Sequence, residues 1–230
     1  MQKIKLKLLI VLSFLGFTKT FQAQDWANLQ KYQEANSSLS APVKGEDRVV
    51  FMGNSITEGW SIASPQFFEG KPYINRGISG QTTPQMLLRF RQDVIAIQPK
   101  VVLILAGTND IAGNTGPTTL KQIHDNILSM VELAQSNGIR PIICSVVPAF
   151  DYPWRPGLEP NIKIPKLNSM LKKTAKQLDI IYLDYFSHMA DERNGLPKEL
   201  AEDGVHPTAK GYKIMESLVE KAIQQALLKK

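Results

Sequence analysis

The sequence predicts an α/β fold, a three-layer α/β/α sandwich around a central, mostly parallel five-stranded sheet. Short apolar segments rich in β-branched residues alternate along the chain with segments whose apolar residues recur at helical spacing. The apolar segments are continuous, which is typical of strands buried on both faces. Strands that alternate with amphipathic helices specify a parallel sheet with helices on both sides.

Five strands are expected, and each is a short apolar run. The first ends at Gly53, where a glycine permits a sharp turn. In chain order the expected strands cover residues 48–52, 73–75, 101–105, 141–147 and 180–183.

Amphipathic helices are expected between the strands, because apolar residues three and four apart form a stripe in each interval. One helix ends at Asn137-Gly138, a favourable C-cap, and another is expected to open at Pro165, because proline suits the first helical position. In chain order the expected helices lie around residues 25–35, 83–98, 120–137, 165–178 and 215–227, with a linker through Pro42 before the first strand.

Residues 1–24 are predicted to form a secretory signal peptide. Three lysines precede an apolar run over residues 8–17, and small and polar residues follow it as far as Ala23 and Gln24, where cleavage is expected. The run is too short to span a bilayer. Residues 1–24 contain no cysteine, so nothing there suggests a lipid anchor. An uncleaved N-terminal anchor is the alternative. The mature chain is expected to be secreted or periplasmic, with a helix and linker over 25–46 and one domain over 47–230.

The charge of the mature chain gives no reason to expect a nucleic-acid partner. The formal net charge of +6 includes four lysines within residues 1–24, which carry no acidic residue, so the remainder is close to +2. Stable membrane insertion after cleavage is not expected either. The single cysteine, Cys144, lies in an apolar run and is expected to be a buried core thiol.

Polar segments follow three of the predicted strands, and a fourth precedes the last helix. In a parallel sheet all four are expected to meet at the carboxyl edge, where ligands bind. They supply a serine, a histidine, carboxylates and amide donors, which are the parts that acyl transfer requires. Considered alone, Ser55 would be interpreted as the N-cap of a helix, but the other three polar segments favour a catalytic role instead.

These four segments resemble the sequence blocks of the SGNH hydrolases, also called the GDSL esterase/lipase family. The resemblance extends from about Arg48 to the closing helix and implies a flavodoxin-like sandwich. The matching blocks are Gly53-Asn54-Ser55-Ile56, Gly80 within residues 78–82, Gly107-Thr108-Asn109-Asp110, and Asp203-Gly204-Val205-His206.

The resemblance implies a role for each matching residue. Ser55 is the expected nucleophile, His206 the base and Asp203 the carboxylate that orients the imidazole. The backbone N–H groups of Ser55 and Gly80 and the side chain of Asn109 are the expected oxyanion hole. No cofactor is implied.

The residues themselves are consistent with these roles. Asp203 is three residues from His206, close enough to reach one ring nitrogen while the other faces Ser55. Asp184 is the rival orienter, although it can simply cap the following loop. The other histidines are interpreted as surface residues, His124 beside a helical stripe and His188 in a polar loop. Asn109 could equally cap a loop together with Asp110.

The sequence departs from the family pattern at Asn54, where the family carries aspartate. An amide keeps many hydrogen bonds of a carboxylate but not its charge, so the loop network rather than the triad is affected.

Other chemistries are poorly supported. The Gly-x-Ser-x-Gly elbow of α/β hydrolases is excluded because Thr57 occupies the second glycine position. No dinucleotide or P-loop glycine pattern is present. Three scattered histidines and one cysteine offer no metal-ligand spacing, so no metal is expected.

Substrate residues are expected in the loop over 150–156, which follows the fourth strand. Trp154 and Arg155 lie there, and Trp60 lies soon after Ser55. Aromatic rings could stack on a sugar, line an acyl pocket or pack the loop, and Arg155 or Arg76 could hold an acidic sugar or form surface ion pairs.

By family analogy, the expected activity is hydrolysis of short acyl esters, acetyl above all, on a small molecule or a glycan. The alternatives are a lysophospholipase or thioesterase of the same family, a sugar acetyltransferase that uses the same triad, and a non-catalytic glycan- or acyl-binding protein.

Overall fold

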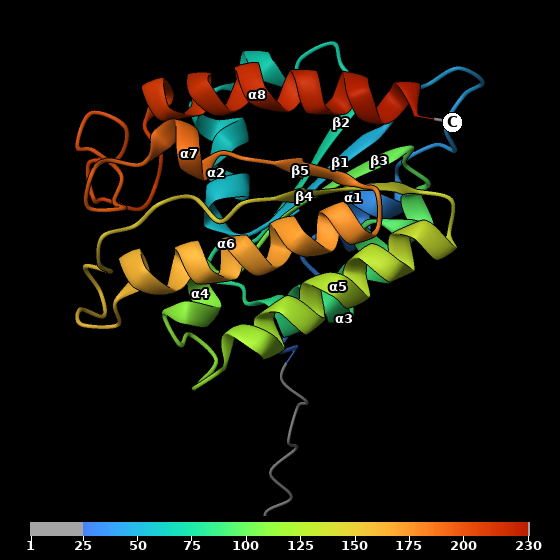
Figure 1. The fold of residues 1–230 in the computed structure, drawn as a ribbon. Coiled ribbons are helices and arrows are strands. Elements are labelled where there is room, and N and C mark those ends of the chain that lie inside the picture. Colours follow the sequence, from blue (N-terminus) through green and yellow to red (C-terminus); the bar gives the residue numbers. More distant parts are fainter. Residues whose placement is uncertain (1–24, 230) are drawn as a thin grey trace, which may run out of the picture.

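The computed structural model describes residues 25–229, so the predicted signal peptide lies outside the described residues. The centre is a five-stranded, all-parallel sheet with the strand order β2-β1-β3-β4-β5 (Figure 1). The predicted α/β fold is confirmed. In chain order the strands are β1 (Val49–Gly53), β2 (Tyr73–Gly77), β3 (Val101–Leu105), β4 (Arg140–Cys144) and β5 (Ile181–Leu183).

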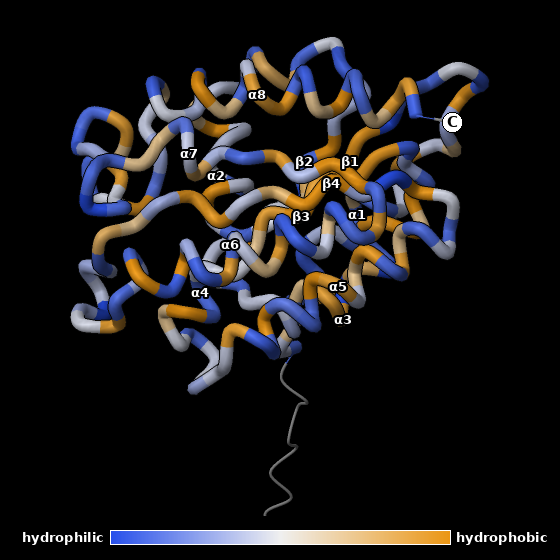
Figure 2. Tube along the Cα trace, in the orientation of Figure 1, coloured by the Kyte–Doolittle hydropathy of each residue, from blue (hydrophilic) through white to orange (hydrophobic). Residues whose placement is uncertain are grey.

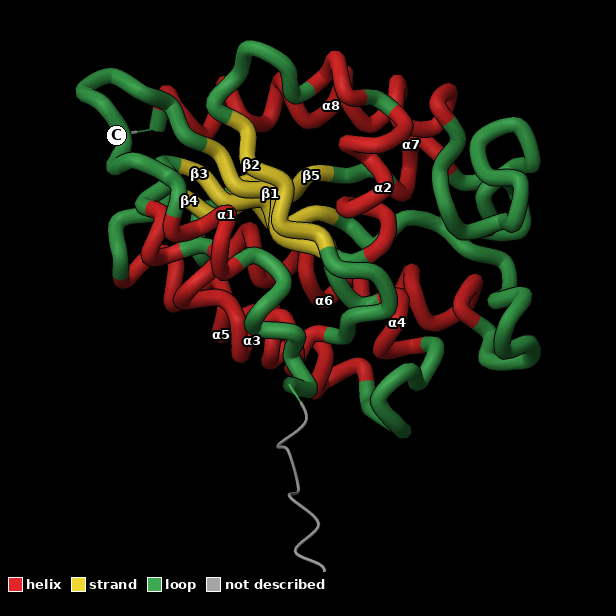
Figure 3. Tube along the Cα trace, turned by 180° about the vertical axis from the view of Figure 1, so that it is seen from behind, coloured by secondary structure: helices red, strands yellow, loops and turns green. Residues whose placement is uncertain are grey.

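Helices cover both faces of the sheet, and Figure 3 shows the strands between the two helical layers. One layer contains α2 (Ser55–Ala63), α7 (Phe186–Met189) and α8 (Ala209–Leu228). The other contains α3 (Thr83–Asp93), α5 (Leu120–Ser136) and α6 (Pro160–Gln177). Short helices α1 (Gln33–Ser37) and α4 (Thr108–Ile111), with 3₁₀ turns η1 (Pro65–Phe67) and η2 (Ile95–Ile97), complete the fold.

The sheet separates two apolar cores, because successive strand residues point to opposite faces. In β1, Val50 and Met52 face the core beneath α3, α5 and α6, whereas Val49 and Phe51 face the core beneath α2 and α8. All five β1 residues are buried. Figure 2 shows the resulting concentration of apolar residues along the strands.

Several helix boundaries differ from those predicted. The helix expected over 83–98 ends at Asp93, and Gln98 adopts a left-handed conformation before Pro99. The helix expected to open at Pro165 begins five residues earlier, at Pro160, so the prediction was wrong and Pro165 lies inside it. Both prolines satisfy the preference for the helix start, and only the earlier one occupies it.

Other elements are also displaced. The helix expected around 25–35 is the shorter α1, preceded by turns in which Asn28 has φ 53°. The closing helix begins at Ala209, where the side chain of Thr208 caps it. His188 lies in α7 rather than in a loop.

Cys144 is buried at the end of β4, as predicted, and burial raises the pKa of its thiol. Within residues 25–229, no helix has both the length and the apolar character needed to cross a membrane.

Candidate active site

The four predicted segments meet at the carboxyl edge of the sheet. The loops after β1, β2 and β3 and the loop before α8 together contribute to a cavity of about 270 Å³. The residues lining it are Ser55, Ser79, Gly80, Asn109, Asn114, Trp154 and His206.

Ser55 is exposed to this cavity because of a tight turn between β1 and α2. A Cβ atom at Gly53 would collide with the side chain of Thr57, and one at the paired Gly77 would collide with the α2 backbone at Glu58. Two glycines therefore let α2 pack directly on the strand ends. Asn54 caps the helix, its Oδ1 accepting the Ile56 N–H at 3.0 Å.

A hydrogen-bonded chain joins the predicted serine, histidine and aspartate. Ser55 Oγ lies 2.9 Å from His206 Nε2, and His206 Nδ1 lies 2.6 Å from Asp203 Oδ2. A proton on Nδ1 donated to the carboxylate leaves Nε2 free to accept the Ser55 hydroxyl proton. This is the geometry in which a histidine can act as a base toward a serine.

Asp203 is held in its ionised form. Its other oxygen, Oδ1, accepts the backbone N–H groups of Val205 at 2.9 Å and His206 at 2.8 Å. Burial alone raises the pKa of this carboxyl, but the hydrogen bonds from His206 and Val205 outweigh it and lower the pKa below the ordinary value. At neutral pH the carboxylate can therefore orient the imidazole and balance a charge on it.

Backbone donors border the same cavity. Gly80 has φ 76°, a left-handed conformation that favours glycine, and Ser55 is the first residue of α2. Across residues 25–229, the N–H groups of Ser55 and Gly80 have no hydrogen-bond acceptor. Free N–H groups at a helix start and a turn can bind an anion.

Asn109 is buried beside these groups, 3 % exposed. Its Nδ2 donates to the Gln81 carbonyl at 3.0 Å, which leaves one amide hydrogen unassigned. The three predicted oxyanion donors therefore border one cavity. The hydrogen bond to the Gln81 carbonyl holds the Asn109 side chain in place.

Asp110, which the sequence suggested only as a loop cap, joins two helices beneath the site. Both of its carboxylate oxygens lie 3.0 Å from the Thr83 N–H at the start of α3, and Oδ1 accepts the Thr83 hydroxyl at 2.5 Å. Burial raises the pKa of Asp110 to about 6 despite these hydrogen bonds. In the sequence, the only indication that Asp110 makes structural hydrogen bonds was its position next to Asn109.

Trp154 is the one predicted substrate residue that lines the cavity. Its ring centroid lies 6.1 Å from that of His206, and the ring stacks on Tyr152 with the centroids 5.2 Å apart. Tyr152 is fully buried, with its hydroxyl 2.8 Å from that of Thr108. Trp154 is 46 % exposed, so the structure holds an indole ring beside the histidine and open to solvent.

Trp60 does not lie at the cavity, and its assignment as a substrate residue is corrected. It is 1 % exposed and stacks against Phe67 and Tyr212 in the core. The reason is helical spacing, because Trp60 and Ile56 are four residues apart in α2 and share its buried face.

The predicted arginines also lie outside this cavity. Arg155 donates to the carbonyls of Ala112 and Gly113 and lines a neighbouring pocket of about 320 Å³. Arg76 is 5 % exposed and binds Asn36. Arg76 is therefore unavailable to a ligand at Ser55.

The remaining titratable candidates have structural contacts. Asp184 accepts the Ser187 N–H at 3.0 Å and so caps α7, the simpler of its two predicted roles. His124 Nε2 lies 2.7 Å from the Thr174 hydroxyl. In the part of the chain that the structure describes, no group of three His, Cys, Asp or Glu side chains could hold a metal ion.

Residues 51–214 match the model of the GDSL-like lipase/acylhydrolase family. Among solved structures, a proposed acylhydrolase from Bacteroides fragilis NCTC 9343 is 48% identical with a TM-score of 0.87, covering 89% of this chain and 99% of that one. An acetylxylan esterase from Xylanibacter ruminicola is 25% identical over 91% of this chain, which spans about half (49%) of that relative's length. Thioesterase 1/protease 1/lysophospholipase L1 of Escherichia coli K12 is 26% identical, covering 77% of this chain and 84% of that protein.

Proposed function

The chain belongs to the GDSL-like lipase/acylhydrolase family, and from that premise we propose that it is a secreted serine esterase that removes short acyl groups, acetyl above all, from carbohydrate. The observation that carries the proposal is the continuous chain Ser55–His206–Asp203 in an open cavity, with free backbone N–H groups beside the serine.

Acylation follows from this geometry. His206 Nε2 takes the Ser55 hydroxyl proton as Oγ attacks the ester carbonyl carbon. The negative charge that develops on the carbonyl oxygen is stabilised by the N–H groups of Ser55 and Gly80 and by the Asn109 amide. The protonated imidazole, balanced by Asp203, then gives its proton to the departing sugar oxygen, which leaves an acyl-serine.

Deacylation repeats these steps with water. His206 takes a proton from the water molecule that attacks the acyl-serine, and it returns that proton to Ser55 Oγ as the carboxylic acid leaves. A sugar hydroxyl in place of water would give acyl transfer instead of hydrolysis. We propose water because the cavity is open to solvent at Trp154 and His206.

A short acyl group is proposed because the cavity is small, about 270 Å³. Pockets that hold drug-sized ligands span roughly 300 to 1,000 Å³. Carbohydrate is proposed as the alcohol because the exposed indole of Trp154, held by Tyr152, offers a flat apolar face beside His206. The similarity to an acetylxylan esterase supports both choices.

Secretion is proposed from the basic and apolar pattern of residues 1–24. Peptide sequencing of the mature N-terminus in the native host tests it. A protein whose N-terminus is still Met1 would contradict cleavage and favour an anchor.

The activity is tested by hydrolysis of p-nitrophenyl esters from acetyl to palmitoyl, with Ser55→Ala as the matched variant, followed by acetylated xylo-oligosaccharides. We expect the highest kcat/KM on acetyl esters and its loss in Ser55→Ala. A preference for long chains would indicate a lysophospholipase or thioesterase instead. Absence of Ser55-dependent turnover on every ester would leave a glycan-binding protein or a transferase.

A further inference from the structure

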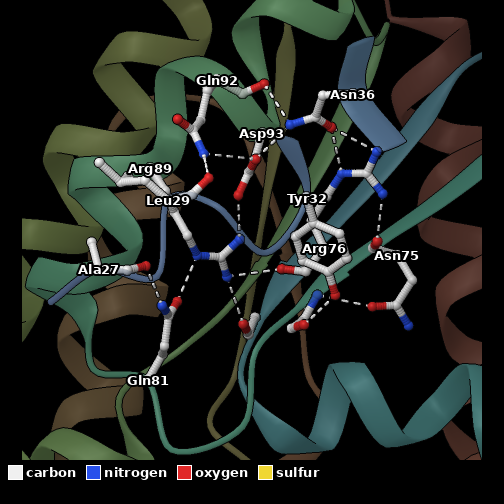
Figure 4. Close-up of polar contacts among 12 residues, drawn as sticks. Ala27, Leu29, Tyr32, Asn36, Asn75, Arg76, Gln81, Arg89, Gln92 and Asp93 are labelled. Atoms are coloured by element: carbon white, nitrogen blue, oxygen red, sulfur yellow. Dashed lines mark hydrogen bonds and ion pairs between the residues drawn. The ribbon is translucent and has the colours of Figure 1, made fainter. Parts of the chain in front are cut away.

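A fully buried guanidinium lies beneath the turn that carries Ser55. Arg89, on α3, is 0 % exposed and pairs with Asp93, also on α3, at 2.9 Å. Its Nε and Nη2 donors reach three other segments (Figure 4). Nε donates to Gln81 Oε1 at 2.5 Å, and Nη2 donates to the carbonyls of Gly53 at 3.0 Å and Arg76 at 2.8 Å.

The three acceptors outside α3 lie in or next to the loops that form the site. Gly53 is two residues before the nucleophile. Arg76 precedes Gly77, at which β2 ends, and Gln81 directly follows Gly80. The Gln81 backbone carbonyl also binds the Asn109 amide. One side chain thus connects the nucleophile turn to both ends of the loop over residues 77–81, which we call the oxyanion loop.

A segment before the sheet binds the same network. Residues 25–39, which we call the N-terminal strap, include Asn36, whose Nδ2 lies 2.6 Å from Asp93 Oδ1 and whose Oδ1 accepts both Nε and Nη2 of Arg76 (Figure 4). The strap lies outside residues 51–214, the part that matches the family model.

The strap also contacts the oxyanion loop directly. The Tyr32 hydroxyl donates to the Gly77 carbonyl, and the Ala27 carbonyl accepts Gln81 Nε2 at 2.7 Å (Figure 4). The loop is therefore tied to the strap at its first and last residues.

A second route from the strap runs over the surface. Lys31 pairs with Glu58 Oε1 at 3.0 Å. The other Glu58 oxygen accepts the Ser79 N–H at 2.8 Å and the Ser79 hydroxyl at 2.5 Å. Ser79 is the residue before Gly80, so this route ends next to the proposed oxyanion donor.

We propose that Arg89 and the N-terminal strap are positioning elements that fix the Gly80 N–H opposite Ser55. The inference rests on the proposed function. A glycine loop with an unpaired N–H has little conformational preference of its own, whereas stabilisation of an oxyanion needs donors placed within about 3 Å of the developing charge. The strap and Arg89 supply that constraint through the Arg76, Gly77 and Gln81 contacts. Neither Arg89 nor the strap lines the cavity.

Tyr32→Phe tests the direct contact, because it removes one hydroxyl and keeps the ring. We expect kcat on p-nitrophenyl acetate to fall about threefold to tenfold with KM nearly unchanged, because losing this hydrogen bond loosens the Gly80 N–H that acts on the transition state. Amide hydrogen exchange in residues 77–81 is expected to accelerate. Tyr73→Phe is the matched control. Its hydroxyl donates to Glu220 at 3.0 Å, at the opposite end of β2, and we expect wild-type kcat.

Lys31→Met tests the surface route in a variant that keeps its fold, because this side chain is 42% exposed. We expect about a twofold to threefold fall in kcat, since an exposed ion pair contributes little on its own, with faster exchange at Ser79 and Gly80.

Unchanged kcat and unchanged exchange in both variants would overturn the proposal. A lower melting temperature with unchanged kcat would also overturn the proposal, because the strap would then contribute only to folding stability. Should the wild-type protein show no Ser55-dependent turnover, the proposed function fails and the exchange comparison decides this inference separately. Faster exchange of the oxyanion loop then supports it, and equal exchange overturns it.

Discussion

His206 is bound twice by Asp203, a residue only three positions away. One carboxylate oxygen lies 2.6 Å from the ring Nδ1, and the other accepts the His206 backbone N–H at 2.8 Å. The carboxylate therefore fixes both the backbone position and the ring orientation of the proposed base. A change at Asp203 is expected to alter tautomer and geometry together.

Asp203→Asn is expected to lower kcat by about 10³- to 10⁴-fold, because the amide can donate to Nδ1 and favour the wrong tautomer. The melting temperature should change little. Asp184→Asn is the matched control, since Asp184 caps α7 through the Ser187 N–H, and its kcat on p-nitrophenyl acetate should equal that of the wild type. Comparable losses in both variants would contradict the assignment of Asp203.

Asn109→Ala is expected to lower kcat about 10²-fold with little effect on KM, because its amide is proposed to act on the transition state and not on the bound ester. Asn137→Ala, at an exposed amide that caps the end of α5, is the control and should retain full activity. Steady-state kinetics on one acetyl ester suffice. A rise in KM at constant kcat would show that Asn109 binds substrate instead.

Trp154→Ala is expected to raise KM for acetylated xylo-oligosaccharides about tenfold, since it removes an apolar face worth about 1–2 kcal/mol when covered by a sugar. Turnover of ethyl acetate, which is too small to need the ring, should be nearly unchanged and serves as the internal control. Equal KM values for the oligosaccharide in variant and wild type would remove the argument for a sugar platform.

Asp110 is expected to make stability fall as pH rises from about 4 to 6. Burial raises its folded-state pKa from 3.8 to about 6, so in this window the unfolded chain loses a proton that the folded protein retains. A rise of about two pKa units corresponds to a loss of about 3 kcal/mol in folding stability, which is complete above pH 6. Asp110→Asn should flatten this part of the curve, as measured by melting temperatures between pH 4 and 7. A slope equal to that of the wild type would assign the effect to another group.

Asn54→Asp is expected to remain active within about threefold of the wild type. The new carboxylate can still accept the Ile56 N–H, and a negative charge at the start of α2 is favourable by about 0.3–1 kcal/mol. The measurement is kcat/KM on p-nitrophenyl acetate beside a circular-dichroism spectrum. A folded but inactive variant would show that the neutral amide is itself required.

Much of the site was predictable because its groups are local in sequence. Asp203 and His206 share one short loop, and Gly53 to Ser55 form one turn, so residue type and spacing alone indicated their partnership. The strand pattern was equally direct, since β1 and β3 are buried at every position and are apolar throughout.

The remaining features depend on tertiary contacts that no local pattern encodes. Trp60 follows the nucleophile closely in sequence, yet the helical period turns it into the core. Arg89 and Asp93 are four residues apart on a helix, a spacing typical of an exposed ion pair, yet both are buried and Asn36 of the strap binds Asp93. Pro160 and Pro165 are both acceptable helix starts, and only packing decides between them.

The chain has a single cysteine, and it is enclosed at the end of β4 with its thiol pKa raised. Folding therefore needs no oxidant and no disulfide isomerase, whatever compartment receives the protein. Recombinant production in a reducing cytoplasm should give the same fold, and dithiothreitol in an assay should leave it intact.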